Sequence, residues 1–350
     1  MEQGTLLIVG GAGYIGSHIV QELTKANIPC IVLDDLSTGH REAVRDVKLV
    51  VGSVTDSDLL DSIFRNRPIS GAVHLAGPTA VGDSMEDPLP YYEVHVVGTH
   101  TLVAAMQRHG VPNLVYSSSS AVYGNPSEVP IPEDHPLEPI SPYGRCKHIA
   151  EQLLRDADAA YGLRSVSLRY FNAAGANWED GLGEDHDPET HLIPRILRVA
   201  QAAAAHGDGR REAAPEPLPI YGDDYATHDG TCVRDYIHVV DLARAHLLAM
   251  DWLAQGGATT SINLGAKKGA SVKEVVAAVE AATGIAIPAE VVGRRAGDPP
   301  LLIAEVQRAR ELLGWEPLHS DLHHIVETAW RWCERHPLGF ASPPQPAASE

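Results

Sequence analysis

The chain has 350 residues, 44% of them hydrophobic, and a formal net charge of −19 at pH 7. This length is enough for one large domain or two lobes with a sizeable core, and the acidic balance argues against a surface that binds nucleic acid or an anionic membrane. No apolar stretch approaches the ~18 residues that a membrane helix needs, and no signal-like segment precedes the first expected strand. Cys30, Cys146, Cys232 and Cys333 lack disulfide or metal spacing, so the sequence predicts a protein of the reducing cytoplasm.

A glycine-rich turn directly follows the first apolar run. Gly10, Gly13 and Gly16 fit a G-x-x-G-x-x-G spacing, and a G-x-G-x-x-G spacing begins at Gly11. Such a turn lets the backbone approach a pyrophosphate at the N-terminus of the next helix. The second apolar run ends in Asp34, 18 residues after Gly16, a spacing that suits hydrogen bonds to ribose hydroxyls. Because this carboxylate would repel a 2′-phosphate, the pattern predicts NAD rather than NADP.

Strand-like and helical segments alternate up to about residue 172, which is typical of a doubly wound parallel sheet. The expected strands are 6–10, 28–34, 47–52, 71–76, 113–118 and 165–171, and the expected helices include 56–66, 90–109 and 143–161. We therefore predict an α/β fold with a Rossmann-type domain over residues 1–172 and a smaller α/β lobe over 173–340. Within the stretch near 235–265, we expect Tyr236–Val240 and Ser261–Leu264 to return to the first sheet. The Pro/Ala/Ser-rich residues 341–350 are predicted to be a mobile tail.

Four serines, Ser117–Ser120, end the strand expected at 113–118. A serine cluster after a strand is more often a turn or a helix cap. Ligands, however, bind at the carboxyl edge of a parallel sheet. A hydroxyl at this edge would be placed to bridge a substrate oxygen and a phenol from the next motif.

The segment Ser141–Lys147 places a phenol and an ammonium four residues apart at the start of an expected helix. Ser141 suits the N-cap and Pro142 the first helical position, so Tyr143 falls in the first turn and shares a face with Lys147. A general base at neutral pH requires the phenol pKa to fall from about 10 to near 7. The ammonium and a bound cationic cofactor together would supply this change. The spacing alone is common by chance, and the preceding motifs give it meaning.

Beyond residue 173 the regular alternation stops. The segment Glu184–His191 contains acids and imidazoles that suggest a metal site, but such residues in a Pro-broken loop more often make turns. We therefore predict no metal. Arg234 and Arg295 offer guanidinium groups that suit diphosphate oxygens, although a single arginine is more often part of a surface ion pair.

Together these motifs resemble the extended short-chain dehydrogenase/reductase family, and more narrowly its 4-epimerases of UDP-sugars such as UDP-glucose. The resemblance extends from Leu6 to about Pro337 and rests on GGAGYIGSH, HLAG, AVGDS, YSSSSAVYG, SPYGRCK, RYFNAAGA, GEDHDPETHLIP and DGTCVRDYIHV. It implies epimerisation at C4 of a UDP-sugar through a transient 4-keto sugar, with NAD retained between turnovers. It also implies that the C-terminal lobe binds the nucleotide sugar, and that a homodimer packs through the helices near 90–109 and 143–161.

The resemblance further implies roles for individual residues. The catalytic residues would be Ser119, with Ser120 as a looser candidate, Tyr143 as acid/base and Lys147 as the group that tunes it. The residues implied to bind NAD are Gly10, Gly13, Tyr14, Ile15, Gly16, Asp34, Asp35, Leu36, Ser53, Val54, Leu75, Ala76, Gly77, His95, Tyr143, Lys147 and Phe171. Those implied to bind the substrate are Ser119, Tyr143, Asn172, Leu192, Tyr221, Arg234, Arg295 and Asp298, with Tyr221 facing the uracil.

Four positions depart from the pattern of well-known epimerases in this family. Ser53 stands where Asp is frequent, Thr79 where Lys is frequent, His95 where Asn is common, and Leu302 where some relatives have Tyr. His95 is either a buried neutral histidine or a group that makes activity depend on pH. Leu302 leaves a roomier pocket, so UDP-N-acetylhexosamines and UDP-pentoses stay open as substrates.

Two other functions use the same fold. Nucleotide-sugar dehydratases of this type carry Asp-Glu directly after the catalytic hydroxyl residue, and the Ser120-Ala121 found here argues against elimination. A non-catalytic NAD-binding scaffold would be expected to lose the serine, tyrosine or lysine, and all three are present. The changes at Ser53, Thr79 and His95 are the only evidence for a scaffold.

Overall fold

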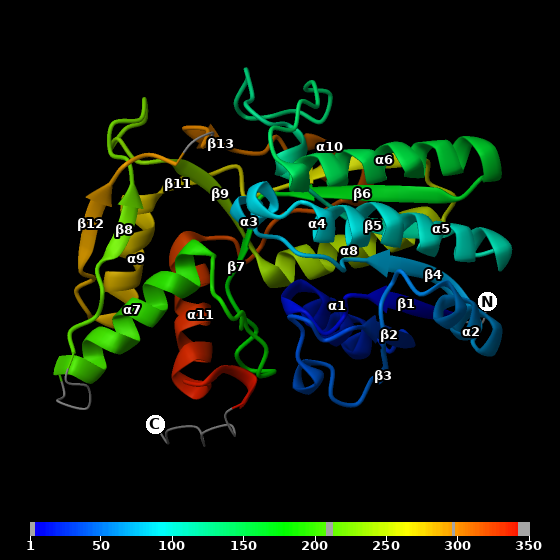
Figure 1. Cartoon of the computed structure of the whole chain (residues 1–350), viewed down its shortest axis with the longest axis horizontal. Coiled ribbons are helices and arrows are strands. Elements are labelled where there is room, and N and C mark those ends of the chain that lie inside the picture. The colour runs from blue at the N-terminus through cyan, green and yellow to red at the C-terminus, as the bar shows by residue number, and fades with distance from the viewer. Residues whose placement is uncertain (1–3, 208–212, 296–297, 342–350) are drawn as a thin grey trace.

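The computed structural model describes residues 4–207, 213–295 and 298–341. Within them Figure 1 shows a large layer of strands and helices, and a smaller lobe at the left of the view. Helices cover both faces of the larger sheet. This arrangement confirms the predicted α/β fold class.

The larger sheet has seven described strands in the order β10-β6-β5-β4-β1-β2-β3, and each pairing between them is parallel. This is the 3-2-1-4-5-6 order of a Rossmann fold with one further strand beside β6. The strands are β1 (Thr5–Val9), β2 (Cys30–Asp34), β3 (Lys48–Val51), β4 (Ile69–His74), β5 (Asn113–Ser119), β6 (Arg164–Tyr170) and β10 (Thr260–Leu264).

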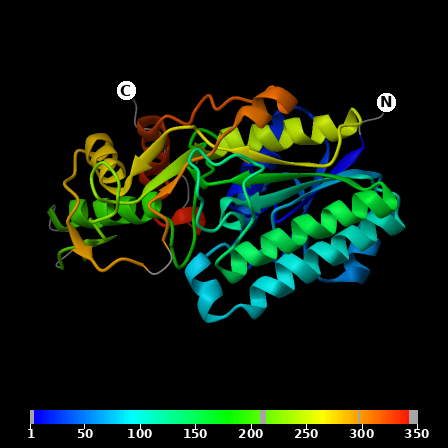
Figure 2. The same cartoon turned by 90° about the horizontal axis from the view of Figure 1, so that it is seen from above.

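Both faces of this sheet are buried, which explains why its strands are apolar runs rather than alternating patterns. In β1, for example, Leu7 points into one core cluster and Ile8 into the other. Figure 2 shows α5 and α6 side by side on one face, with α8 and α10 across the sheet. The first face carries α2 (Ser57–Asn66), α5 (Thr99–Arg108) and α6 (Pro142–Tyr161), and the second carries α1 (Tyr14–Lys25), α8 (Val239–Ala254) and α10 (Gln307–Leu313).

The helix expected at 90–109 consists of three pieces. These are α4 (Leu89–Tyr92), the π-helical segment η2 (Glu93–Gly98) and α5. Single π-helical turns within a helix are frequent at functional sites. Here the π turn carries His95.

The two segments expected to return to the first sheet have different positions. Ser261–Leu264 lies in β10 and pairs with β6. Tyr236–Val240 does not join that sheet, so this expectation was wrong. Its first residues end β9 (Val233–His238), which pairs with β7 (Asn172–Ala174), β11 (Gly269–Ser271) and β13 (Leu301–Leu302). A buried apolar run shows that a strand is covered, but not which sheet it joins.

The smaller lobe packs three helices around a core of its own. Its two-stranded sheet pairs β8 (Leu218–Tyr221) in parallel with β12 (Ala289–Val292), beside α7 (Leu192–Gly207), α9 (Val272–Thr283) and α11 (Leu322–Arg335). A capping box between Ser271 and Glu274 fixes the start of α9.

The short elements that remain are η1 (Arg41–Ala43), α3 (Val81–Glu86), η3 (Ser120–Val122) and η4 (Gly339–Ala341). Apart from residue 341, the tail expected at 341–350 lies outside the described residues. None of the helices described here combines the length and apolar character needed to span a bilayer.

Candidate active site

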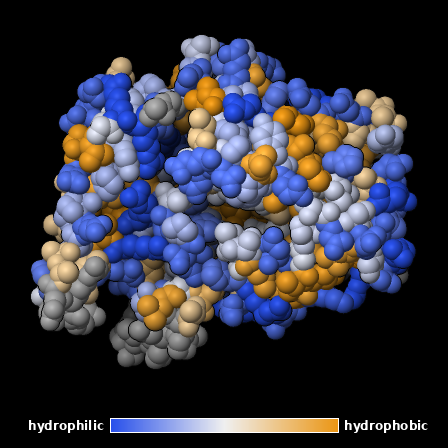
Figure 3. Space-filling view, in the orientation of Figure 1, coloured by the Kyte–Doolittle hydropathy of each residue, from blue (hydrophilic) through white to orange (hydrophobic). Residues whose placement is uncertain are grey.

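A cavity of about 1110 Å³ lies between the carboxyl edge of the large sheet and the smaller lobe. Figure 3 shows the surface hollowed where the two parts meet. Parallel sheets bind ligands at this edge, beside the point where the strand order reverses. In this chain that point lies between β1 and β4.

The glycine turn forms one wall of the cavity. Gly10 has φ +81°, and a Cβ atom there would lie 2.6 Å from the Ala76 amide nitrogen. A Cβ atom on Gly16 would collide with the Gly10 carbonyl oxygen, so the turn needs glycine at both positions. α1 begins within this motif at Tyr14, so Gly16 lies in its first turn, and its N-cap, Gly13, has no side chain to cap the first amides. Such an exposed helix N-terminus suits a phosphate group.

Asp34, at the end of β2, lies beside this turn and also lines the cavity. Its Oδ2 accepts a hydrogen bond from the Ala12 amide at 2.8 Å, and its Oδ1 accepts one from the Leu36 amide at 2.9 Å. Burial raises the pKa of this carboxyl, while these two amides act in the opposite direction. The carboxylate therefore holds the turn in shape as well as facing the cavity.

Tyr143 and Lys147 lie on one face of α6, as the spacing predicts. Ser141 is the N-cap, with its hydroxyl accepting from the Gly144 amide at 3.1 Å, and Pro142 is the first helical residue. Tyr143 is 7% exposed and hydrogen-bonds with Ser119. The Lys147 Nζ donates to the Ser117 carbonyl at 2.7 Å and lies 5.6 Å from the centre of the Tyr143 ring. Serine, phenol and ammonium thus meet at one point of the cavity.

The protein alone does not lower the phenol pKa, and the expectation from the sequence also included a bound cationic cofactor. Burial raises the pKa of Tyr143 to about 12, and the hydrogen bond with Ser119 opposes this only in part. Burial also lowers the pKa of Lys147 to about 7. Desolvation disfavours the charged form of each group, so a phenolate at neutral pH requires positive charge from a ligand in the cavity.

His95 lies behind Tyr143 rather than in the cavity wall. It is fully buried, and its ring meets the Tyr143 ring edge to face at a centroid distance of 5.6 Å. Its Nε2 donates to the Pro78 carbonyl at 2.8 Å, which makes Nε2 the protonated nitrogen of a neutral ring. Burial, followed by the nearby Lys147, holds the pKa of His95 well below its usual value. A buried neutral histidine, rather than a group that titrates near pH 7, is what the geometry supports.

Two arginines reach the cavity from the smaller lobe. Arg234 donates from Nη2 to Asp298 Oδ1 at 2.9 Å. The guanidinium of Arg295 stacks 3.9 Å above the centre of the Tyr221 ring, and a hydrogen bond with this arginine lowers the pKa of the phenol. Asn172 is fixed by a hydrogen bond from Nδ2 to the Asp235 carbonyl at 3.0 Å.

Most of the predicted site residues line this one cavity. They are Gly10, Gly13, Tyr14, Ile15, Gly16, Asp34, Asp35, Ser53, Val54, Leu75, Ala76, Gly77, Ser119, Tyr143, Lys147, Phe171, Asn172, Leu192, Arg234, Arg295 and Asp298. Three others, Leu36, His95 and Tyr221, lie directly behind lining residues. Of the departures, Ser53, Thr79 and Leu302 line the cavity.

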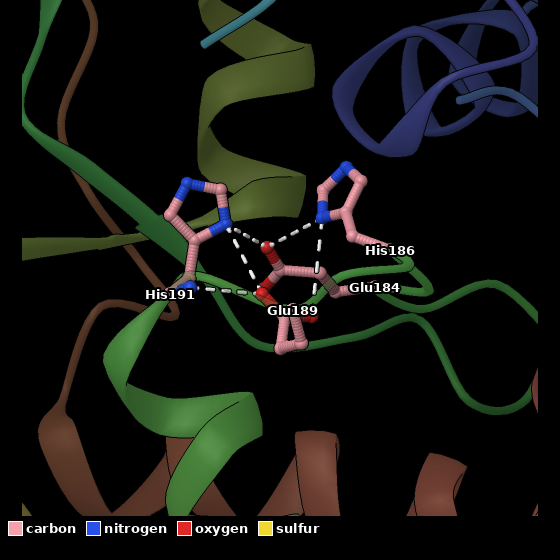
Figure 4. A group of neighbouring side chains, drawn as sticks. All are labelled: Glu184, His186, Glu189 and His191. Atoms are coloured by element: carbon pink, nitrogen blue, oxygen red, sulfur yellow. Dashed lines mark hydrogen bonds and ion pairs between the residues drawn. The ribbon is translucent and has the colours of Figure 1, made fainter. Parts of the chain in front are cut away.

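The cavity wall also includes a loop for which the sequence predicted only turns. Glu184, His186, Glu189 and His191 line the cavity and turn their side chains toward one another, as Figure 4 shows. The alternation of acids and histidines over eight residues was the available signal. It did not reveal that the loop folds back on itself before α7.

Comparison with known proteins identifies the family. The family model described as the NAD dependent epimerase/dehydratase family matches residues 6–265. The chain belongs to this family. A UDP-glucose 4-epimerase of Halalkalibacterium halodurans is 47% identical over 337 residues, which cover 96% of this chain and 98% of that relative.

Solved structures of the family have the same fold. The UDP-glucose 4-epimerase from Brucella ovis in complex with NAD is 46% identical, has a TM-score of 0.87 and matches 93% of this chain and 97% of its own. The enzyme from Bifidobacterium longum in complex with NAD+ and UDP is 36% identical with a TM-score of 0.87, over 96% of this chain and 99% of its own. The resemblance inferred from the sequence motifs is thereby confirmed.

Proposed function

We propose that this protein is an NAD-dependent 4-epimerase that interconverts UDP-glucose and UDP-galactose. The observation that carries the proposal is the meeting of Ser119, Tyr143 and Lys147 in a cavity that also contains a nucleotide-binding turn and two arginines. The relatives named above are epimerases of this type, and one of the solved structures contains both NAD and UDP.

The residues of the cavity fit NAD. The amides at the start of α1 suit its pyrophosphate, Asp34 suits the ribose hydroxyls, and Tyr143 and Lys147 lie where the nicotinamide half would end. NAD, when bound, supplies the acceptor and donor of hydride at C4 of the sugar. A cation in this pocket also favours the phenolate over the phenol, which the buried residues alone do not achieve.

Tyr143 would remove the proton from the 4-hydroxyl of the sugar. It would return a proton to the same oxygen after the 4-keto sugar has rotated to present its other face. Ser119 is placed to hydrogen-bond with both the phenol and the sugar oxygen. Lys147, held by the Ser117 carbonyl, would stabilise the phenolate. Arg234 and Arg295 would anchor the diphosphate, so that the 4-keto sugar can present either face while the nucleotide stays fixed.

Leu302 extends the same argument to other sugars, because it lines the cavity where some relatives have Tyr. UDP-N-acetylhexosamines and UDP-pentoses are therefore the second candidate substrates. A panel of UDP-hexoses, UDP-N-acetylhexosamines and UDP-pentoses ranks them by kcat/KM.

The proposal includes the setting of the enzyme. We place it in the cytoplasm and in galactose metabolism, and the four free cysteines agree with a reducing compartment. We also propose a homodimer that packs through α5 and α6. Exposed apolar side chains at Met85, Leu89 and Val97 lie in the neighbouring elements and support such a contact.

A coupled assay on NAD-containing protein tests the function, with UDP-galactose as substrate and UDP-glucose as the measured product. We expect Tyr143→Phe to lower kcat by roughly 10²–10⁴-fold, the usual contribution of a general acid/base, while NAD content and the far-UV spectrum stay unchanged. Tyr161→Phe, at a 65% exposed position at the end of the same helix, is the matched control and should keep full activity.

Two results would contradict the proposal. Absence of interconversion for every UDP-4-epimer pair of the panel removes the epimerase function. Retained turnover in Tyr143→Phe removes this tyrosine from the acid/base role while leaving the function in place.

A further inference from the structure

The loop before α7 gathers two carboxylates and two imidazoles. Glu184, His186, Glu189 and His191 each offer one ligand atom, and these atoms all lie within 4.8 Å of one another. In Figure 4 the four side chains converge from successive positions of one folded loop, with the start of α7 below them. Two other acids of the same loop do not join the cluster. Asp185 accepts a hydrogen bond from the Phe340 amide at 2.9 Å, and Asp187 is exposed.

The contacts inside this cluster are incomplete. The side chain of Glu189 is 1% exposed, yet its Oε2 has no hydrogen-bond partner among the described residues. The Nδ1 atom of His186 is also buried and makes no hydrogen bond among the described residues, although Glu184 Oε1 lies 3.3 Å away. Both atoms point into the cluster, 3.9 Å from each other. A buried polar atom without a hydrogen bond costs about 1–3 kcal/mol. Within the described cluster, Glu189 Oε2 faces only the His186 imidazole, 3.9 Å away, so this buried oxygen indicates a missing ligand.

The spacing of the ligand atoms matches a small cation. A tetrahedral ion with bonds of about 2.0–2.2 Å separates its ligand atoms by roughly 3.3–3.6 Å. Glu184 Oε1 lies 3.3 Å from His186 Nδ1, and His191 Nδ1 lies 3.6 Å from Glu189 Oε1. The 2.5 Å hydrogen bond between Glu184 Oε1 and His191 Nδ1 would have to open, and the wider pairs of the cluster, which reach up to 4.8 Å, would have to close.

We propose that Glu184, His186, Glu189 and His191 bind one divalent transition-metal ion, with Zn²⁺ as the ion of choice. Two imidazoles and two carboxylates suit Zn²⁺ and its first-row neighbours, whereas Ca²⁺ and Mg²⁺ prefer sets made of oxygen alone. Two carboxylates balance the charge of the ion. The four protein ligands close its shell, so the ion would be structural rather than catalytic.

The place of the cluster indicates what the ion would hold together. The four ligands line the cavity, and the His186 ring meets the ring of Tyr14, the first residue of α1, edge to face at 6.4 Å. On the other side the loop leads into α7, whose Leu192 and Arg195 also line the cavity. An ion here would fix the loop that leads into α7 and lies against the first residue of α1. This site does not depend on the proposed reaction.

Calorimetric titration with Zn²⁺ tests the site. Full-length, tag-free protein with its NAD is dialysed against a chelator, then against chelator-free buffer, and titrated at neutral pH. We expect one ion per chain with a micromolar or tighter Kd. Glu189→Gln and His186→Ala should each raise Kd roughly tenfold or more, in line with the loss of a ligand. Asp187→Asn removes an exposed carboxylate from the same loop and is the control expected to bind normally.

Spectra of the Co²⁺ form give a second readout that does not depend on a large substitution. Tetrahedral nitrogen and oxygen coordination should give visible d–d bands in the wild type that Glu189→Gln weakens or loses. Far-UV spectra and NAD content confirm that each variant is folded. Failure of the wild type to bind Zn²⁺, or equal binding by the wild type and Glu189→Gln, would overturn the site without affecting the epimerase assay.

Discussion

Helix α6 buries two ionisable groups one turn apart, and among the described residues only one of them has a counter-ion in hydrogen-bond contact. Lys147 and Glu151 are 3% and 1% exposed. The only described hydrogen bond of the Lys147 ammonium goes to a neutral carbonyl, that of Ser117. Glu151 faces Arg169 across two bonds, from Nε at 2.9 Å and from Nη2 at 2.6 Å, and also accepts from the Ser118 hydroxyl. One charge is uncompensated, and the other is fully paired.

The pKa values follow this difference. Burial lowers the pKa of Lys147 to about 7, and the charges of Cys146 and Glu151 oppose this only in part. For Glu151, burial acts to raise the pKa, but the bonds from Arg169 outweigh it and hold the pKa below its ordinary value. Arg169 is itself held by the Tyr123 hydroxyl and the Glu133 carbonyl. The Glu151 carboxylate links α6 to β5 and β6, whereas the Lys147 ammonium has no described counter-ion in hydrogen-bond contact and faces the cavity, where a ligand would bind.

Removing the paired charge should have the largest effect on stability. Glu151→Gln leaves the Arg169 guanidinium buried without a counter-charge, which typically costs about 3–5 kcal/mol. Chemical unfolding at pH 7 measures the loss. Because the pKa of Glu151 is lowered by folding, its contribution is present above about pH 4.5 and declines as pH falls. The gap between wild type and variant should therefore narrow in acid.

Asp156→Asn is the control for this variant, since Asp156 is an exposed acid on the same helix. It should change stability by less than about 0.5 kcal/mol. A loss of that small size in Glu151→Gln as well would mean that the pair does not hold the elements together, and the contrast with Lys147 would disappear.

Removing the unpaired charge should act in the opposite direction. Lys147→Met gives up one hydrogen bond but no longer buries an ammonium, so we expect a gain on the order of 2 kcal/mol at pH 6 in protein stripped of NAD, together with loss of activity. Folding lowers the pKa of Lys147 from 10.5 to about 7, so the wild type sheds a proton on folding between these values. Its stability relative to the variant should rise with pH across that interval.

Unfolding midpoints of both proteins between pH 6 and pH 10 measure how their difference in stability changes with pH. A variant that is less stable than the wild type at pH 6 would show that the bond to Ser117 outweighs the desolvation of the ammonium. Lys147 would then be a structural residue, like Glu151.

Local signals in the sequence predicted the functional side of this comparison, namely the placement of Tyr143 and Lys147 on α6. Ser141, Pro142, Tyr143 and Lys147 lie within seven residues, so a cap, a fixed φ and a helical repeat were sufficient to place them. The pairing of Glu151 with Arg169 depends on how α6 lies against β6, which no spacing reveals. For the same reason the sequence did not give the sheet that β9 joins.

The loop Glu184–His191 shows what local sequence signals cannot predict. Its residue types suggested a metal site, and the presence of Pro188 suggested turns. Both features are local, and neither states whether side chains converge. Convergence came from the packing of the loop between α1 and α7, which is tertiary information.

A substitution of His95 should have the smallest effect of these variants. This neutral histidine lies beside Tyr143 and near the unpaired Lys147. Burial holds the pKa of His95 well below the usual value, so we expect a neutral imidazole at pH 7. His95→Asn keeps a donor near the Pro78 carbonyl but loses the ring that packs edge-on against Tyr143. We expect a fall of a few-fold in kcat, about 1 kcal/mol or less in the barrier.

The pH–rate profile is the measurement that separates the two interpretations of this histidine. A neutral His95 contributes no ionisation between pH 6 and pH 8, so wild type and variant should share the same acid limb. If the wild type has an acid limb in that range that His95→Asn removes, the imidazole takes up a proton there despite its burial. Lys147 would then have a second titrating group beside it, and the phenolate of Tyr143 would depend on the protonation of both.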